Sequence, residues 1–161
     1  MERKSRSKIG IFIAVIIALG LCLVLYSTFD RYEPSEDEIA IRIKFNTKED
    51  VGLLVYDYCV DGQDEYSGGV SNADRSLIAH DSDDIFVVLN RDELNSASEA
   101  VQLSMRFRII TEYVDPNFEN VYPEDITRYI EAINFEARFG TMYSVTITGD
   151  EANGYKAVLS R

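Results

Sequence analysis

An uninterrupted apolar run near the amino terminus is the feature that most constrains this chain. Residues Ile9–Tyr26 read IGIFIAVIIALGLCLVLY, 18 positions without a charged residue, an amide or a proline. At about 1.5 Å per residue, a helix of this length covers roughly 27 Å, close to the roughly 30 Å hydrocarbon core of a bilayer. A single segment crosses as a helix, because every backbone polar group needs an internal partner there. The run therefore predicts one transmembrane anchor at residues 9–26.

Charged residues on the two sides of this run differ in sign, which sets its expected orientation. The residues before it include four basic ones, Arg3, Lys4, Arg6 and Lys8. The residues after it include five acidic ones, Asp30, Glu33, Glu36, Asp37 and Glu38. Because the basic flank of a membrane helix stays in the cytoplasm, we expect residues 1–8 to be cytoplasmic. The sequence thus predicts a single-pass cell-membrane protein with an acidic tether at residues 27–38 and an extracytoplasmic domain at residues 39–161.

Three other fates of the apolar run are weighed against an uncleaved signal-anchor. A cleaved signal peptide has a shorter apolar part, of about 7 to 15 residues, followed by a small-residue cleavage site that is missing here. A lipoprotein would use Cys22, but the bulky Leu21 precedes it and the apolar Leu23–Leu25 follows it. A type IV pilin would need a glycine before its processing site and an acidic residue early in the run, and both are absent. We therefore expect the anchor to be retained.

The part of the chain beyond the apolar run is strongly acidic. The whole chain has 16 basic and 28 acidic residues; without Glu2 and the four basic residues of the flank, 12 basic and 27 acidic residues remain, a net charge of −15. Such a surface repels nucleic acid and anionic lipid, so we expect no nucleic-acid partner. It attracts cationic peptides, basic proteins or calcium, although acidity also serves to keep an exported domain soluble.

Alternation of apolar and polar residues with a period of two predicts half-buried strands throughout the outer segment. This alternation occurs at residues 39–45, 101–109, 133–139 and 143–147. Shorter or more apolar runs add strands at residues 51–60, 66–70, 85–89 and 155–159. The run at 51–60 is apolar on both faces, which is typical of a central strand. This pattern predicts a mainly β domain, a β-sandwich of immunoglobulin-like or similar Greek-key type.

The connections between these strands carry turn and helix signals. Gly140-Thr141 is typical of a tight hairpin that joins the strands on either side of it. Gly149–Gly154 (GDEANG) predicts a second turn. Pro123 followed by Glu124 and Asp125 is typical of a helix start. Apolar residues at helical spacing follow it and predict one short helix of one or two turns: Ile126, Tyr129 and Ile130.

The residues that familiar catalytic and metal sites need are missing or stand in the wrong pattern. His80 is the only histidine and Cys59 the only cysteine beyond the anchor, so no internal disulfide forms and any cysteine–histidine mechanism would need this pair. Acidic clusters suited to calcium occur at Asp57–Asp64, Asp81–Asp84 and Asp150–Glu151, but none completes an EF-hand. We assign no catalytic, cofactor-binding or metal-ligating residue, and we expect the protein not to be an enzyme.

Aromatic residues and loops supply the remaining functional signal. Tyr56 and Tyr58 share one face of the expected central strand and are predicted to pack inside the sandwich. Three further tyrosines flank a loop and stay open as binding residues: Tyr113, Tyr122 and Tyr129. Because rigid β-sandwiches commonly bind through loops, we expect recognition at Asp115–Asp125 or Ser71–Asp84.

The leading hypothesis is a membrane-anchored binding or accessory module of the cell envelope that meets another protein. One alternative is a structural subunit of a membrane complex, whose helix packs against another helix through its small residues Gly10, Ala14, Ala18 and Gly20. The other is an anchored envelope enzyme of unfamiliar type that uses carboxylates or His80. The partner, the oligomeric state and the strand order do not follow from the sequence.

Overall fold

The structure is a computed structural model, and it describes residues 32–83, 85–94, 96–114 and 123–160. The chain divides into two units, Met1–Tyr32 and Glu33–Arg161. Residues 1–8, expected to be a cytoplasmic flank, and the anchor expected at residues 9–26 lie outside the described residues, as does the first part of the expected tether. Within the described part, no helix has the length and apolar character needed to cross a membrane.

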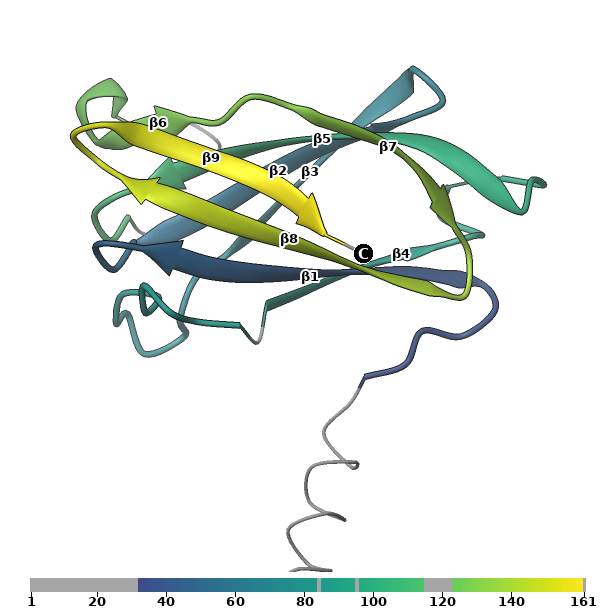
Figure 1. Ribbon diagram of the computed structural model, residues 1–161, viewed down its shortest axis with the longest axis horizontal. Coiled ribbons are helices and arrows are strands. Elements are labelled where there is room, and N and C mark those ends of the chain that lie inside the picture. The colour runs from purple at the N-terminus through teal and green to yellow at the C-terminus, as the bar shows by residue number, and fades with distance from the viewer. Residues whose placement is uncertain (1–31, 84, 95, 115–122, 161) are drawn as a thin grey trace, which may run out of the picture. The chain divides into compact units, whose positions relative to one another are not determined.

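The second unit is a β-sandwich of two sheets (Figure 1). The first, called here the β1 sheet, has the order β4-β1-β8-β9. Its strands are β1 (Glu38–Thr47), β4 (Ile85–Asn90), β8 (Thr141–Asp150) and β9 (Gly154–Ser160). β1 runs antiparallel to β4 and parallel to β8, while β8 and β9 form an antiparallel hairpin. The parallel pair places the first strand of the domain beside one of its last.

The second sheet, called here the β2 sheet, has the order β3-β2-β5-β6, with β7 also paired to β5. Its strands are β2 (Leu53–Val60), β3 (Gln63–Val70), β5 (Ala100–Ile110), β6 (Thr127–Tyr129) and β7 (Ile133–Arg138). Arg108 lies opposite Tyr129, and Met105 lies opposite Ile133. Two residues of β5 therefore lie opposite three residues, 130–132, between β6 and β7. These three residues form a bulge that separates β6 from β7 along the same edge of β5.

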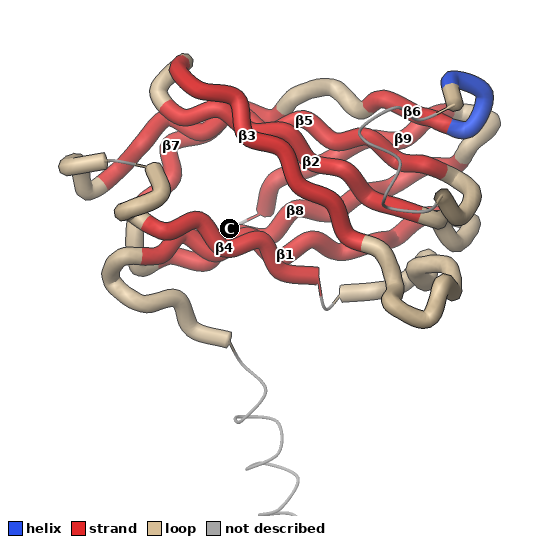
Figure 2. Tube along the Cα trace, turned by 180° about the vertical axis from the view of Figure 1, so that it is seen from behind, coloured by secondary structure: helices blue, strands red, loops and turns tan. Residues whose placement is uncertain are grey.

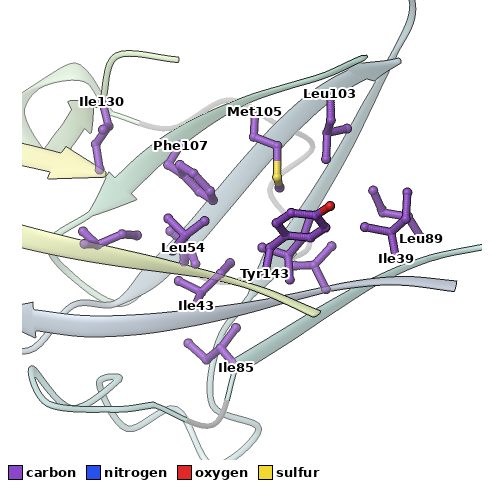
Figure 3. Packing of buried hydrophobic residues seen from close by; sticks show 14 of the residues in the cluster. Ile39, Ile43, Leu54, Ile85, Leu89, Leu103, Met105, Phe107, Ile130 and Tyr143 are labelled. Carbon is purple, nitrogen blue, oxygen red and sulfur yellow. The ribbon is translucent and has the colours of Figure 1, made fainter. Parts of the chain in front are cut away.

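The inward side chains of the two sheets form one apolar core (Figure 3). The long strands contribute every second residue, because successive side chains of a strand point to opposite faces. Its largest fully buried side chains include Ile39, Ile41, Leu54, Leu103, Met105 and Phe107. A smaller apolar cluster lies on the other face of the β2 sheet, where Leu53, Val55 and Ile110 are covered by Val114 and Ile126. β2 is therefore packed on both faces at its start, as the sequence predicts.

All eight expected strands are present, although their ends differ by a few residues. β2 begins at Leu53 rather than Val51: Val51 pairs with Ile78 instead, and Gly52 passes against the backbone of Glu112. A Cβ at Gly52 would lie 1.8 Å from the Glu112 carbonyl oxygen. The turn at Asp61-Gly62 joins β2 to β3 with positive φ at both residues, the conformation of a two-residue hairpin.

The hairpin expected at Gly140-Thr141 is wrong. β7 pairs with β5 in one sheet, whereas β8 pairs with β1 and β9 in the other. Gly140 adopts a φ of 73° and turns the chain from one sheet to the opposite one. The inward side chains of the two strands then meet across the core, where the rings of Phe135 and Tyr143 lie 5.1 Å apart between centroids. A turn signal alone does not distinguish a hairpin from such a crossover.

The expected short helix is present only as the 3-10 turn η1 (Glu124–Ile126). Tyr129 and Ile130, which the helical spacing assigned to it, belong to extended backbone instead. The Ile130 N–H donates to the Phe107 carbonyl at 2.9 Å, and Thr127–Tyr129 pair with β5. Hydrogen bonds to a neighbouring strand thus replace the few that a single helical turn would offer.

Replacing Phe107 with alanine should destabilise the domain by about 3–5 kcal/mol, because a large side chain that is 0% exposed leaves a cavity. The matched control is Phe86→Ala, since Phe86 is 37% exposed on the outer face of the β1 sheet. We expect that change to cost about 1 kcal/mol or less. Denaturant unfolding of both variants measures the difference, and equal losses would contradict the described core.

Candidate functional site

The strand directions gather one set of loops at the end of the domain opposite the point where the chain enters. β1 runs away from the entry at residues 33–37. β8 runs in the same direction as β1, and β4 runs back toward the entry. We call the far end the distal end; its described residues are 48–52, 71–83, 111–114, 123–126 and 151–153. It lies on the left in Figure 1 and on the right in Figure 2. The described part of Ser71–Asp84 and the described residues 123–125 of Asp115–Asp125, the two loops that the sequence selected for binding, belong to this end.

Segment Ile78–Ser82 of the first loop is fixed to the edge of β1. Its carbonyls accept from β1, with Thr47 N–H to His80 at 3.0 Å and Phe45 N–H to Ser82 at 2.7 Å. Ile78 forms a two-way bridge with Val51 and is itself buried. The segment thus pairs with the end of β1 beyond the part that β4 covers, so backbone hydrogen bonds hold this loop in place.

The β8–β9 turn is fixed to the β1–β2 turn by a second group of polar contacts. Asp150 pairs with the ammonium of Lys48 and accepts from the Asn153 backbone N–H at 2.7 Å. The Lys48 hydrogen bond, with those of Asn153, lowers the pKa of Asp150 to about 2. Glu49 accepts from the Tyr155 hydroxyl, and burial followed by this contact raises the pKa of Tyr155. Asp150 therefore stays ionised and Tyr155 stays neutral across physiological pH.

His80 links the first loop to the same β1–β2 turn. Its ring Nδ1 lies 2.8 Å from Asp50 Oδ1, and its backbone N–H donates to the same oxygen at 2.9 Å. The hydrogen bond to Asp50 raises the pKa of His80, and the same hydrogen bond lowers the pKa of Asp50. Both side chains are about half exposed, so solvent screens their attraction.

Carboxylates dominate the described part of the distal end. They are Glu49, Asp50, Asp74, Asp81, Asp83, Glu112, Glu124, Asp125 and Glu151, with Asp150 at its margin. The same segments contain two basic residues, Lys48 and Arg75, and Arg128 follows shortly after segment 123–126, on β6. Lys48 and Arg128 are already paired, with Asp150 and Glu151. The end that collects the loops is therefore also the end that carries excess negative charge.

The acidic clusters considered for calcium do not converge in the described part of the chain. Asp57 is buried in the β2 sheet, and Asp61 caps the Gln102 backbone N–H at 2.8 Å. Asp83 pairs with Arg42 at 2.7 Å. Within the described residues, no group of three or more histidine, cysteine or acidic side chains is arranged to hold a metal. The side chain of Asp64 and residue Asp84 are not described.

The candidate cysteine–histidine pair is separated by the fold. Cys59 lies near the end of β2 at the entry end, half-buried and free, whereas His80 lies in a distal loop. These two residues therefore belong to opposite ends of the sandwich, and the arrangement does not support chemistry shared between them.

Of the tyrosines, Tyr56 and Tyr58 lie where the sequence predicts, on the inner face of β2. Tyr56 and Tyr58 pack against the main core, and Tyr66 of β3 stacks on Tyr58 with 5.0 Å between ring centroids. Burial raises the pKa of Tyr56 and that of Tyr58. Tyr129 is 69% exposed on the outer face of the β2 sheet. Tyr122 lies outside the described residues.

An ionic network on the outer face of the β2 sheet was not found from the sequence. Asp57 Oδ1 accepts from Arg108 Nη2 at 2.9 Å and from the Ser67 hydroxyl at 2.7 Å. Arg106 Nη2 donates to Glu65 at 2.7 Å. Arg106 and Arg108 alternate along the expected strand at 101–109, so their shared face was predictable. Their carboxylate partners were not, because these depend on the register of neighbouring strands.

Comparisons with known proteins do not assign the chain to a family. No protein-family model matches it, and no curated protein matches it. A solved structure described as a Gram-negative toxin is 11% identical over 77% of this chain, with a TM-score of 0.36; the match spans only 22% of that structure. The membrane-binding domain of pneumolysin is 9% identical over 78% of this chain and 96% of its own, with a TM-score of 0.34. Both scores are too low to relate this chain to either protein.

The His80–Asp50 contact predicts a raised titration midpoint for the only histidine. A raised pKa in the folded state means that the contact stabilises the fold below the unfolded pKa of about 6.5 and is lost as pH rises through the folded value. The lowered pKa of Asp50 ends the contact on the acid side. NMR titration of the His80 ring should give a midpoint above 6.5 that falls toward 6.5 in Asp50→Asn. An unchanged midpoint in that variant would refute the contact.

Proposed function

We propose that the chain is a single-pass cell-membrane protein whose extracytoplasmic β-sandwich is a non-catalytic binding module. The apolar run at residues 9–26 supports the anchor, and the change from basic to acidic flanks supports an outward-facing domain. The described domain starts within the acidic tether, and β1 begins at Glu38. Few residues therefore separate the expected membrane helix from the sandwich.

The observation that carries the binding role is the gathering of supported, acidic loops at the distal end. Segment 78–82 is paired to β1, and the turn at 151–153 is held by Glu49, whose Oε1 accepts the Glu151 backbone N–H at 2.5 Å. Loops held in this way lose little conformational entropy on binding. Their carboxylates favour a partner with a cationic surface and disfavour an acidic one.

The proposed mechanism is direct recognition of basic side chains by the distal loops. Ionic attraction at physiological salt reaches about 8 Å, so the partner must approach the loops closely. Leu77 is 42% exposed in the first loop and supplies an apolar contact beside these carboxylates. The partner class we propose is a basic protein or peptide segment of the cell envelope.

Binding of a decalysine peptide tests the position of this surface. The double variant Asp81→Asn/Glu124→Gln removes two exposed distal carboxylates and should weaken binding several-fold. The matched control, Asp92→Asn/Glu99→Gln, removes the same two charges at the entry end. Titration calorimetry on the full-length protein in detergent micelles compares them. Equal weakening would indicate attraction by net charge alone and would contradict a distal binding surface.

The orientation of the anchor is tested separately with single cysteines in a Cys22→Ala/Cys59→Ser background. Ala152 is exposed in the β8–β9 turn, and Ser7 precedes the apolar run. In intact cells, a membrane-impermeant maleimide should label Ala152→Cys at once, and Ser7→Cys only after permeabilisation. The reverse pattern, or labelling of neither residue before permeabilisation, would show that the domain does not face outward.

A further inference from the structure

The outer face of the β2 sheet contains a hollow that the distal loops do not form. It has a volume of about 490 Å³ and is lined by Asp57, Glu65, Ser67, Arg106, Arg108 and Tyr129. A second hollow of about 370 Å³ adjoins it and shares Asp57, Glu65 and Arg106. The bulge between β6 and β7 borders the pair, because Ala132 lines the second hollow. Interrupted strands of this kind are frequent next to binding sites.

Two guanidinium groups stand side by side in this hollow at different depths. Arg106 and Arg108 are two residues apart on β5 and therefore point to the same face. The side chain of Arg108 is 17% exposed and is held by Asp57, whose side chain is 11% exposed. The side chain of Arg106 is 52% exposed and reaches into solvent. One guanidinium is thus fixed in place and the other is accessible.

Hydrogen-bond donors exceed acceptors in this cluster. Each guanidinium carries five N–H donors and no acceptor. Among the described contacts, Arg108 donates through Nη2 to Asp57, while its Nε is buried and has no hydrogen-bond partner. Asp57 Oδ1 also accepts from Ser67, and Asp57 Oδ2 lies 3.9 Å from Arg106 Nε. A ligand that complements the cluster therefore has to bring acceptors.

Glu65 already supplies such an acceptor to the accessible guanidinium. Its Oε1 lies 2.7 Å from Arg106 Nη2, but the two side chains are 65% and 52% exposed. Ion pairs this exposed are weak, because water and salt screen them. An external anion can therefore take the place of Glu65 at little cost. Tyr129, directly opposite Arg108 on β6, offers an exposed ring to the rest of a ligand.

We propose that this hollow is an anion site for a ligand bearing a carboxylate or phosphate group. The ligand's oxygens bind Arg106 in place of Glu65, beside the fixed guanidinium of Arg108, and its body contacts the ring of Tyr129. Glu65 is then an internal competitor that lowers the affinity of the free protein. The site is separate from the loops of the distal end, so its test does not depend on the binding role proposed above.

The test follows the arginine Nε–H NMR signals of full-length protein in detergent micelles during titration with acetate or inorganic phosphate at constant ionic strength. Acetate and phosphate distinguish the two anion types, and saturable shifts with either one support the site. Glu65→Gln should tighten binding several-fold because it frees Arg106, and Arg106→Gln should abolish it.

The matched control is Glu136→Gln on the same face, where Glu136 pairs with the exposed Arg138 at 3.0 Å. It removes the same charge and frees an arginine that does not line the proposed hollow. We expect it to leave the affinity unchanged. Equal tightening in both variants would show that the effect comes from net charge alone and would contradict the role of Glu65. An absence of saturable shifts in the wild type and in Glu65→Gln would refute the site.

Discussion

The parallel pairing of β1 with β8 is the interaction on which the rest of the domain depends. It joins Ile39–Thr47 to Thr141–Gly149, residues about a hundred positions apart in the chain. A parallel pair cannot be closed by a tight turn, so the intervening chain has to travel away and return. It does so by building the β2 sheet, which covers the inner faces of β1 and β8. The same path sends every connection to one of two ends.

Charge is distributed according to this architecture. Between their ends, the outward positions of β1, β8 and β9 carry the basic residues Arg42, Lys44 and Lys156 among uncharged side chains, and no carboxylate. Apart from a few on the β2 sheet, such as Asp57, Glu65 and Glu136, most described carboxylates lie in the loops, and at the distal end they outnumber the basic residues. A sheet face buries polar groups more readily than a loop does, so unpaired acids are better tolerated at the ends. The acidic domain therefore has two chemically different surfaces: the outer face of the β1 sheet, which carries basic and uncharged side chains, and the acidic distal end.

Local patterns predicted the strands well, because burial of one face imposes a period of two. They failed at Gly140-Thr141 and at Ile126–Ile130, where the outcome depended on which neighbour the chain met. The strand after Gly140 pairs with β1 in the opposite sheet, and the backbone of Ile130 hydrogen-bonds to Phe107 on β5. The Asp57–Arg108 pair was equally inaccessible, since it requires the β2–β5 register. The anchor stays a prediction from the sequence pattern of residues 9–26.

Photo-crosslinking in intact cells tests the central claim that the distal end is the binding surface. A benzophenone side chain at Ala79, which is exposed in the first distal loop, is compared with one at Ala97, which is exposed at the entry end. The account predicts a crosslinked species of defined size from position 79 and none from position 97. Crosslinking from position 97 alone, or from neither position, would contradict it.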